Sequence, residues 1–139
     1  LRRIDGYIFA ALLVPGSDTA DYTVRNLVGI DENEGAVAIG SSVEEGERIM
    51  FCRRDRDSAV EDLKRMLNDL KRRAGGKDIR GGLYFSCVAR GPNQFGPDSA
   101  ELGLIRETLG DFPVTGFFAN GEISNNRLYG YTGVLALFL

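Results

Sequence analysis

The feature that most constrains the fold is a change of hydrophobic period in the middle of the chain. Between residues 59 and 70 the apolar side chains recur at steps of three and four, so they share one face of a helix. This set consists of Ala59, Val60, Leu63, Met66, Leu67 and Leu70. The apolar runs on either side are short and bounded by turn-forming residues, as strands are. The chain must therefore pack helices against a sheet.

The other elements follow from the same kind of pattern. Strands are predicted at residues 4–14, 22–30, 36–39, 48–52, 82–88, 114–119 and 128–137. A turn at residues 31–35 joins the second and third strands into a hairpin. The strand–helix–strand unit at residues 82–119 predicts a parallel pair with a right-handed crossover. The predicted order is ββββαβαββ, and the fold class is α+β, with a mixed β-sheet and two helices.

Both helices carry end signals. Asp57 or Ser58 is the predicted N-cap of the first helix. In the second helix, which ends before Gly110, Asp98 and Glu101 have the spacing of a capping box.

Composition excludes several classes of function. With 139 residues, 43% of them hydrophobic and 27% charged, the chain has the character of one soluble globular domain. The net charge of −3 argues against a nucleic-acid partner. No apolar run approaches the roughly 20 residues that span a bilayer, so no membrane insertion is predicted. Two cysteines without metal-motif spacing fit a reducing compartment.

The absence of histidine is the sharpest exclusion. A Ser-His-Asp triad, a Cys-His dyad and a histidine zinc site cannot be built from this chain alone. We therefore predict no catalytic residues, no metal site and no cofactor.

A first group of candidate site residues follows the apolar strand at residues 82–88. Ser86, Cys87 and Arg90 place a hydroxyl, a thiol and a guanidinium at one strand end, where they could hold a small anion or carboxylate. In the structural alternative, Cys87 is a small buried hydrophobe and Arg90 is solvated. In a third interpretation, the positive charge of Arg90 activates Cys87, which makes the protein a thiol enzyme or redox sensor.

A second group follows the next strand. Asn120-Gly121-Glu122 could be a tight turn, but the polar segment continues to Arg127, which is longer than a two-residue hairpin needs. Asn120 can both donate and accept hydrogen bonds, which suits an amino-acid-like ligand, and Glu122 could meet its ammonium group. Arg25, inside an apolar strand, is a third candidate, although a solvent-facing charge is the more common outcome there.

Several segments together resemble the C-terminal part of the FIST family of bacterial sensory proteins. They are Tyr22-Thr23-Val24-Arg25-Asn26-Leu27-Val28-Gly29-Ile30-Asp31, Leu83-Tyr84-Phe85-Ser86-Cys87-Val88-Ala89-Arg90-Gly91, Gly116-Phe117-Phe118-Ala119-Asn120-Gly121-Glu122-Ile123 and Leu128-Tyr129-Gly130-Tyr131-Thr132-Gly133. The resemblance implies ligand sensing and not catalysis. The Asn-Gly-Glu pattern of the family implies ligand contacts for Asn120 and Glu122, and its Arg-Asn pattern implies a buried bond or a ligand contact for Arg25.

We therefore expect residues 1–139 to be a single FIST C-terminal-like domain, excised from a longer bacterial cytoplasmic protein that also has an N-terminal FIST half. Its expected function is a non-catalytic sensory domain that binds a small molecule, with an amino acid or related metabolite as the ligand. The expected ligand-binding residues are Arg25, Ser86, Cys87, Arg90, Asn120 and Glu122. The alternatives are an interaction module that packs on the N-terminal half or forms a homodimer, and a Cys87-based thiol or redox protein.

Overall fold

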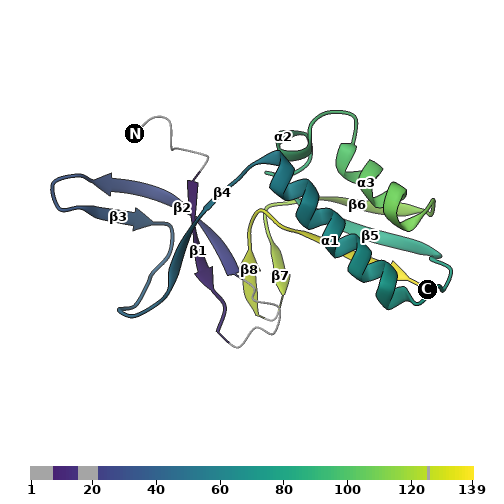
Figure 1. Ribbon diagram of the computed structural model, residues 1–139, viewed down its shortest axis with the longest axis horizontal. Helices are drawn as coiled ribbons and strands as arrows, with labels where there is room; N and C mark the ends of the chain where they lie inside the picture. Colours follow the sequence, from purple (N-terminus) through teal and green to yellow (C-terminus); the bar gives the residue numbers. More distant parts are fainter. Residues whose placement is uncertain (1–7, 16–21, 125) are drawn as a thin grey trace. The chain divides into compact units, whose positions relative to one another are not determined.

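The computed structural model describes residues 8–15, 22–124 and 126–139, which belong to two compact units (Figure 1). One unit ends at Arg54, and the other spans residues 55–139. The prediction that these residues together form a single family domain stays a prediction.

The first unit is an antiparallel sheet with the strand order β3-β2-β1-β4. Its strands are β1 (Ile8–Leu13), β2 (Tyr22–Asp31), β3 (Ala36–Ile39) and β4 (Ile49–Arg53). The pairing of β2 with β3 confirms the predicted hairpin. Residues 4–7 of the first predicted strand lie outside the described residues.

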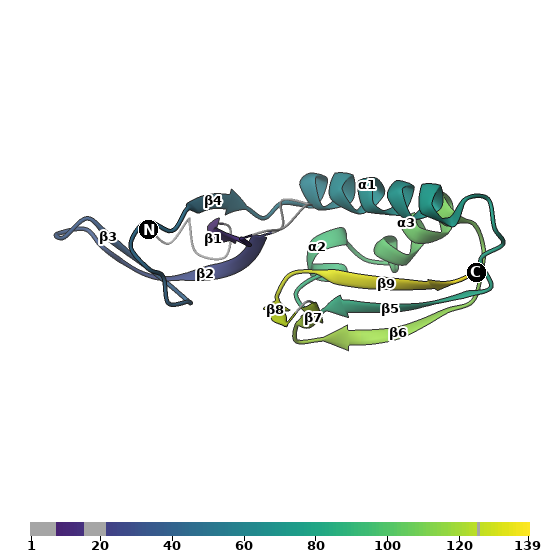
Figure 2. The same ribbon diagram turned by 90° about the horizontal axis from the view of Figure 1, so that it is seen from below.

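The second unit contains a two-stranded sheet, described below, and a three-stranded sheet with helices on one face, as Figure 2 shows. Its elements are α1 (Arg56–Ala74), β5 (Gly81–Cys87), α2 (Pro92–Phe95), α3 (Ala100–Leu109), β6 (Val114–Ala119) and β9 (Gly133–Phe138). The central strand β5 pairs in parallel with β6 and antiparallel with β9. The predicted parallel pair and the α+β class with a mixed sheet are thereby confirmed.

The core of this unit lies between the helices and β5. It is formed by Leu63 and Leu67 of α1, Tyr84 of β5, Phe95 of α2 and Ile105 of α3. The helical period in the sequence correctly identified the contribution of α1. Because side chains alternate along a strand, Tyr84 and Ser86 face the helices, while Phe85 between them faces away.

The C-terminal segment differs from the prediction. In place of one strand at residues 128–137, the chain forms β8 (Arg127–Tyr129) and then β9. β8 pairs with β7 (Glu122–Ser124) in a two-stranded hairpin that was not predicted. The break falls where Tyr131 adopts a left-handed conformation with φ of 61°, which an extended strand cannot include. The short helix α2 was also not predicted, so the described residues contain three helices instead of two.

The N-cap of α1 is Asp55, so the prediction of Asp57 or Ser58 was wrong. The Asp55 carboxylate accepts a bond from the Ser58 backbone N–H at 3.0 Å and another from the Ser58 hydroxyl at 2.9 Å. The cap lies one residue before the first helical residue, Arg56, because the helix begins earlier than its apolar face.

Replacing Asp55 with alanine should lower the free energy of unfolding by about 1 kcal/mol, because the first turn of α1 loses its side-chain acceptor. Urea denaturation followed by circular dichroism measures this difference. Asp55→Asn is the matched control, since asparagine caps helices equally well. If Asp55→Ala and Asp55→Asn lowered the free energy of unfolding equally, the side-chain cap would not stabilise this helix.

Candidate functional site

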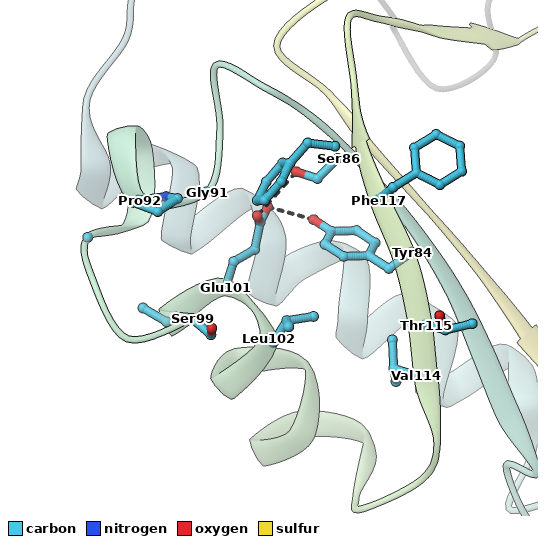
Figure 3. A pocket seen from close by; sticks show the side chains of 14 residues that line it. Tyr84, Ser86, Gly91, Pro92, Ser99, Glu101, Leu102, Val114, Thr115 and Phe117 are labelled. Atoms are coloured by element: carbon cyan, nitrogen blue, oxygen red, sulfur yellow. Dashed lines mark hydrogen bonds between the residues drawn. The ribbon is translucent and has the colours of Figure 1, made fainter.

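A pocket of about 430 Å³ is enclosed on three sides (Figure 3). Strand β6 forms one side, the first turn of α3 forms another, and the loop before α3 forms the third. Its lining residues are Tyr84, Ser86, Gly91, Pro92, Gly96, Ser99, Ala100, Glu101, Leu102, Val114, Thr115, Gly116, Phe117 and Phe118. Most of this wall is apolar. The ring of Phe118 lies directly against Gly91, where an added Cβ would come within 2.7 Å of the ring. Gly91 also has a φ of 54°, so a side chain there would be strained as well as obstructed.

The polar part of the wall is centred on Glu101, which is 4% exposed. Tyr84 donates its hydroxyl to Glu101 Oε1 at 2.6 Å, and Ser86 donates to Oε2 at 3.2 Å. Figure 3 shows these two β5 side chains directed at the carboxylate from the sheet, with Glu101 extending toward them from α3. The carboxylate therefore joins the helix to the central strand.

Arg90 supplies the positive charge that balances this buried carboxylate. Its Nε lies 2.8 Å and its Nη2 2.7 Å from Glu101 Oε1. Its Nη1 also donates to the Tyr131 carbonyl at 3.5 Å, and the guanidinium lies 4.9 Å from the centre of the Phe95 ring. Arg90 is thus held by an ion pair, a backbone acceptor and an aromatic face.

Burial and the ion pair also set the protonation states of these groups. Burial raises the pKa of Tyr84, the charge of Arg90 lowers it, and the Glu101 carboxylate, which accepts a hydrogen bond from the Tyr84 hydroxyl, raises it further. For Arg90, burial alone would lower the pKa, but Tyr84 and Glu101 outweigh it and raise the pKa above its usual value. Tyr84 therefore stays a neutral donor and Arg90 stays charged at neutral pH.

The sequence analysis missed the role of Glu101, and its capping-box prediction was wrong. The residue at the N-cap is Ser99, and its side chain makes no capping bond. Asp98 and Ser99 both have left-handed backbones, with φ of 61° and 55°. Glu101 turns inward because donors on β5 and the following turn satisfy it there. One signal could have found it: Glu101 precedes the buried Ile105 by four residues, so both lie on the inner face of α3.

Of the predicted site residues, Ser86 and Arg90 are brought together, since both donate to Glu101. Ser86 lines the pocket, whereas Arg90 is not among its lining residues and contacts the carboxylate through Oε1. Cys87 is only 5% exposed, and strand alternation turns it away from Ser86. The thiol-based alternative therefore lacks support, because the thiol is buried and the guanidinium is bound to Glu101.

The other three predicted residues are not in the lining of this pocket. Arg25 lies in β2 and donates to the Val24 carbonyl at 2.9 Å. Asn120 is exposed just after β6. Glu122 is 7% exposed and accepts a bond from the Thr132 hydroxyl through Oε2. Its Oε1 has no hydrogen-bond partner among the described residues.

Two further properties concern the described parts of the chain. They contain no group of three or more His, Cys, Asp or Glu side chains arranged to hold a metal ion. In residues 8–15, 22–124 and 126–139, no helix is both long and apolar enough to cross a membrane.

Comparison with known proteins gives a family match and several relatives. The family model described as FIST C domain matches residues 3–125. An uncharacterized protein of Mycobacterium tuberculosis is 38% identical over 132 residues, which cover 92% of this chain and 34% of the relative. An uncharacterized protein of Mycobacterium bovis is 36% identical over 132 residues, which cover 92% of this chain and 33% of the relative. The chain thus spans about a third of the length of these relatives. No solved structure matches.

Proposed function

The chain belongs to the FIST C domain family of sensory signal-transduction domains, and from this premise we propose that it binds a small ligand without catalysing a reaction. The ligand is an amino acid or related metabolite, and it occupies the pocket beside Glu101. The domain works in the cytoplasm, next to the N-terminal FIST half of a longer protein.

The observation that carries this proposal is the pocket itself. Its volume of about 430 Å³ lies within the range of small-molecule sites. Such sites combine apolar walls with a few convergent polar groups, and this one combines Leu102, Val114 and Phe118 with the buried carboxylate of Glu101.

Ligand binding could produce a signal because several structural elements meet at the pocket. A ligand there would contact α3, the loop before it and the edge strand β6 at once. Because a ligand favours whichever arrangement binds it better, occupancy would stabilise one position of α3 and its loop over others. The rest of the longer protein would respond to that change.

A thermal-shift screen of this chain against amino acids, small carboxylates and common metabolites tests the proposal. A ligand present at 100 times its dissociation constant adds about 2.7 kcal/mol of stability, which raises the melting temperature by several degrees. Leu102→Ala, which removes part of the pocket wall, should weaken any hit. Leu128→Ala is the matched control, because Leu128 is 58% exposed and lies outside the lining. A screen without a hit would contradict the proposal.

A second candidate is the interaction module, and the outer face of the three-stranded sheet favours it. Strand alternation places Phe85, Phe117, Val134 and Phe138 on the face opposite the helices. Of these, Phe117 is 66% exposed and Phe138 is 54% exposed. A contiguous apolar face of this kind marks a protein-interaction surface.

Replacing Phe138 with lysine should reduce self-association of this chain and leave its fold intact, because the side chain is more than half exposed on that outer face. Sedimentation velocity over a range of protein concentrations measures the association. Val88→Lys is the matched control, since Val88 is 49% exposed but lies in the turn after β5. Equal association of the two variants would show that the outer face does not mediate self-association.

A further inference from the structure

The two oxygens of the Glu101 carboxylate have different hydrogen-bonding environments. Oε1 accepts from the Tyr84 hydroxyl at 2.6 Å and lies within 2.8 Å of Arg90 Nε and 2.7 Å of Arg90 Nη2. Oε2 has one donor among the described residues, the Ser86 hydroxyl at 3.2 Å, which is long for a bond between two oxygens. A carboxylate oxygen can accept about two bonds. Oε1 is therefore saturated, and Oε2 retains an acceptor position.

The pocket has no matching position for an anion. Among the described residues its lining includes no lysine or arginine, and its acidic side chain is that of Glu101. The nearby guanidinium of Arg90 has Nε and Nη2 on Glu101 and Nη1 directed at the Tyr131 carbonyl. A carboxylate in the pocket would therefore meet a negative charge without a free cation to offset it.

We propose that the pocket recognises an amphipathic ligand through a hydrogen-bond donor, either an ammonium group or a hydroxyl group. The donor binds Oε2 of Glu101 beside the Ser86 hydroxyl, and the apolar body lies against Leu102, Val114 and Phe118. Since Arg90 already balances the charge of Glu101, a neutral hydroxyl suits the site as well as a cation does. A carboxylate on the ligand contributes nothing to binding. This inference rests on the proposed function and specifies its ligand class.

Four compounds with the same ring and nearly the same length separate these possibilities. 2-Phenylethylamine offers an ammonium donor, 2-phenylethanol offers a hydroxyl donor, phenylacetate offers acceptors alone, and ethylbenzene offers neither. Their binding to the 139-residue chain is measured by titration calorimetry, with ligand-detected nuclear magnetic resonance for weak binders. We expect saturable binding of the amine and the alcohol, with phenylacetate and ethylbenzene at least about tenfold weaker.

Two variants connect the result to the residues. Glu101→Gln should weaken the amine by about tenfold or more, because the charged acceptor becomes a neutral amide. This variant also disturbs the ion pair with Arg90, so Ser86→Ala provides a second measurement in which that pair is kept. Ser86→Ala should reduce binding of both donors by several-fold, because the Ser86 hydroxyl beside Oε2, with which either ligand group can also exchange a hydrogen bond, is lost. Circular dichroism establishes that each variant is folded.

The inference is overturned if phenylacetate binds as tightly as the amine, if neither donor binds, or if both variants bind the donors as the wild type does. These results leave the proposed function to be judged by the metabolite screen. A screen hit that lacks a donor would sustain the sensory function and overturn the ligand class. A screen without hits would overturn the function itself.

Discussion

Replacing Glu101 with alanine is expected to lower the free energy of unfolding by about 3–5 kcal/mol, the cost of removing one partner from a buried ion pair. The Arg90 side chain is 14% exposed, so without the carboxylate its charge would remain buried and uncompensated. The Tyr84 hydroxyl, donated to the same oxygen, would lose its acceptor in the same step. Urea denaturation of the wild type and the variant measures the difference.

Glu107→Ala is the matched control for this experiment, since it removes an exposed glutamate from the same helix. It should change the free energy of unfolding by no more than about 0.5 kcal/mol, as surface substitutions usually do. If Glu101→Ala were as mild as the control, the cluster of Glu101, Arg90, Tyr84 and Ser86 would not hold α3 on the sheet.

Replacing Gly116 with alanine should have the second large effect, a loss of about 3 kcal/mol or more. Gly116 lies in β6 directly beside Tyr84 of β5. An added Cβ would lie 1.7 Å from the Tyr84 carbonyl oxygen, so the two strands would have to separate. Because Tyr84 also carries a bond to Glu101, the displacement would reach the pocket wall. Thermal and urea unfolding measure the loss of stability.

Gly103→Ala is the control, because it makes the same glycine-to-alanine change at a position where the new methyl group meets no neighbouring atom. Gly103 lies inside α3, and an added Cβ would meet no atom within 4 Å. Alanine should therefore stabilise the domain by about 0.5–1 kcal/mol, because glycine is the poorer helix former. A stable Gly116→Ala variant would mean that β6 does not pair closely with β5 at this position.

The elements predicted correctly are those whose signal is local and repeated. The helical face that includes Leu63 and Leu67 recurs through several turns, and both residues are buried where the period places them. The parallel pair of β5 and β6 followed from two apolar runs joined by a helical segment. The break at Tyr131 was missed because a single residue with a left-handed backbone leaves no trace in a hydrophobic pattern.

The site was predicted in part. Ser86 and Arg90 were placed at the strand end, but as the ligands of an anion. Their partner in the structure is Glu101, which is separated from them by 15 and 11 residues. Its position three residues after Asp98 has an equally good local explanation as a capping box. Whether Glu101 caps its helix or joins a buried ion pair depends on how α3 packs against β5. A short window of sequence contains no information about that contact.

The hydrogen bond from Tyr84 to Glu101 gives the chain an optical property. The sequence contains five tyrosines and no tryptophan, so tryptophan absorption and emission do not mask the near-ultraviolet signal of the tyrosine rings. The absorption and emission of a phenol depend on the acceptor of its hydroxyl proton, and the acceptor of Tyr84 is a carboxylate in the wall of the pocket. The domain therefore carries a native chromophore hydrogen-bonded in the wall of the pocket, and its spectrum should change when a ligand alters that bond, without any label.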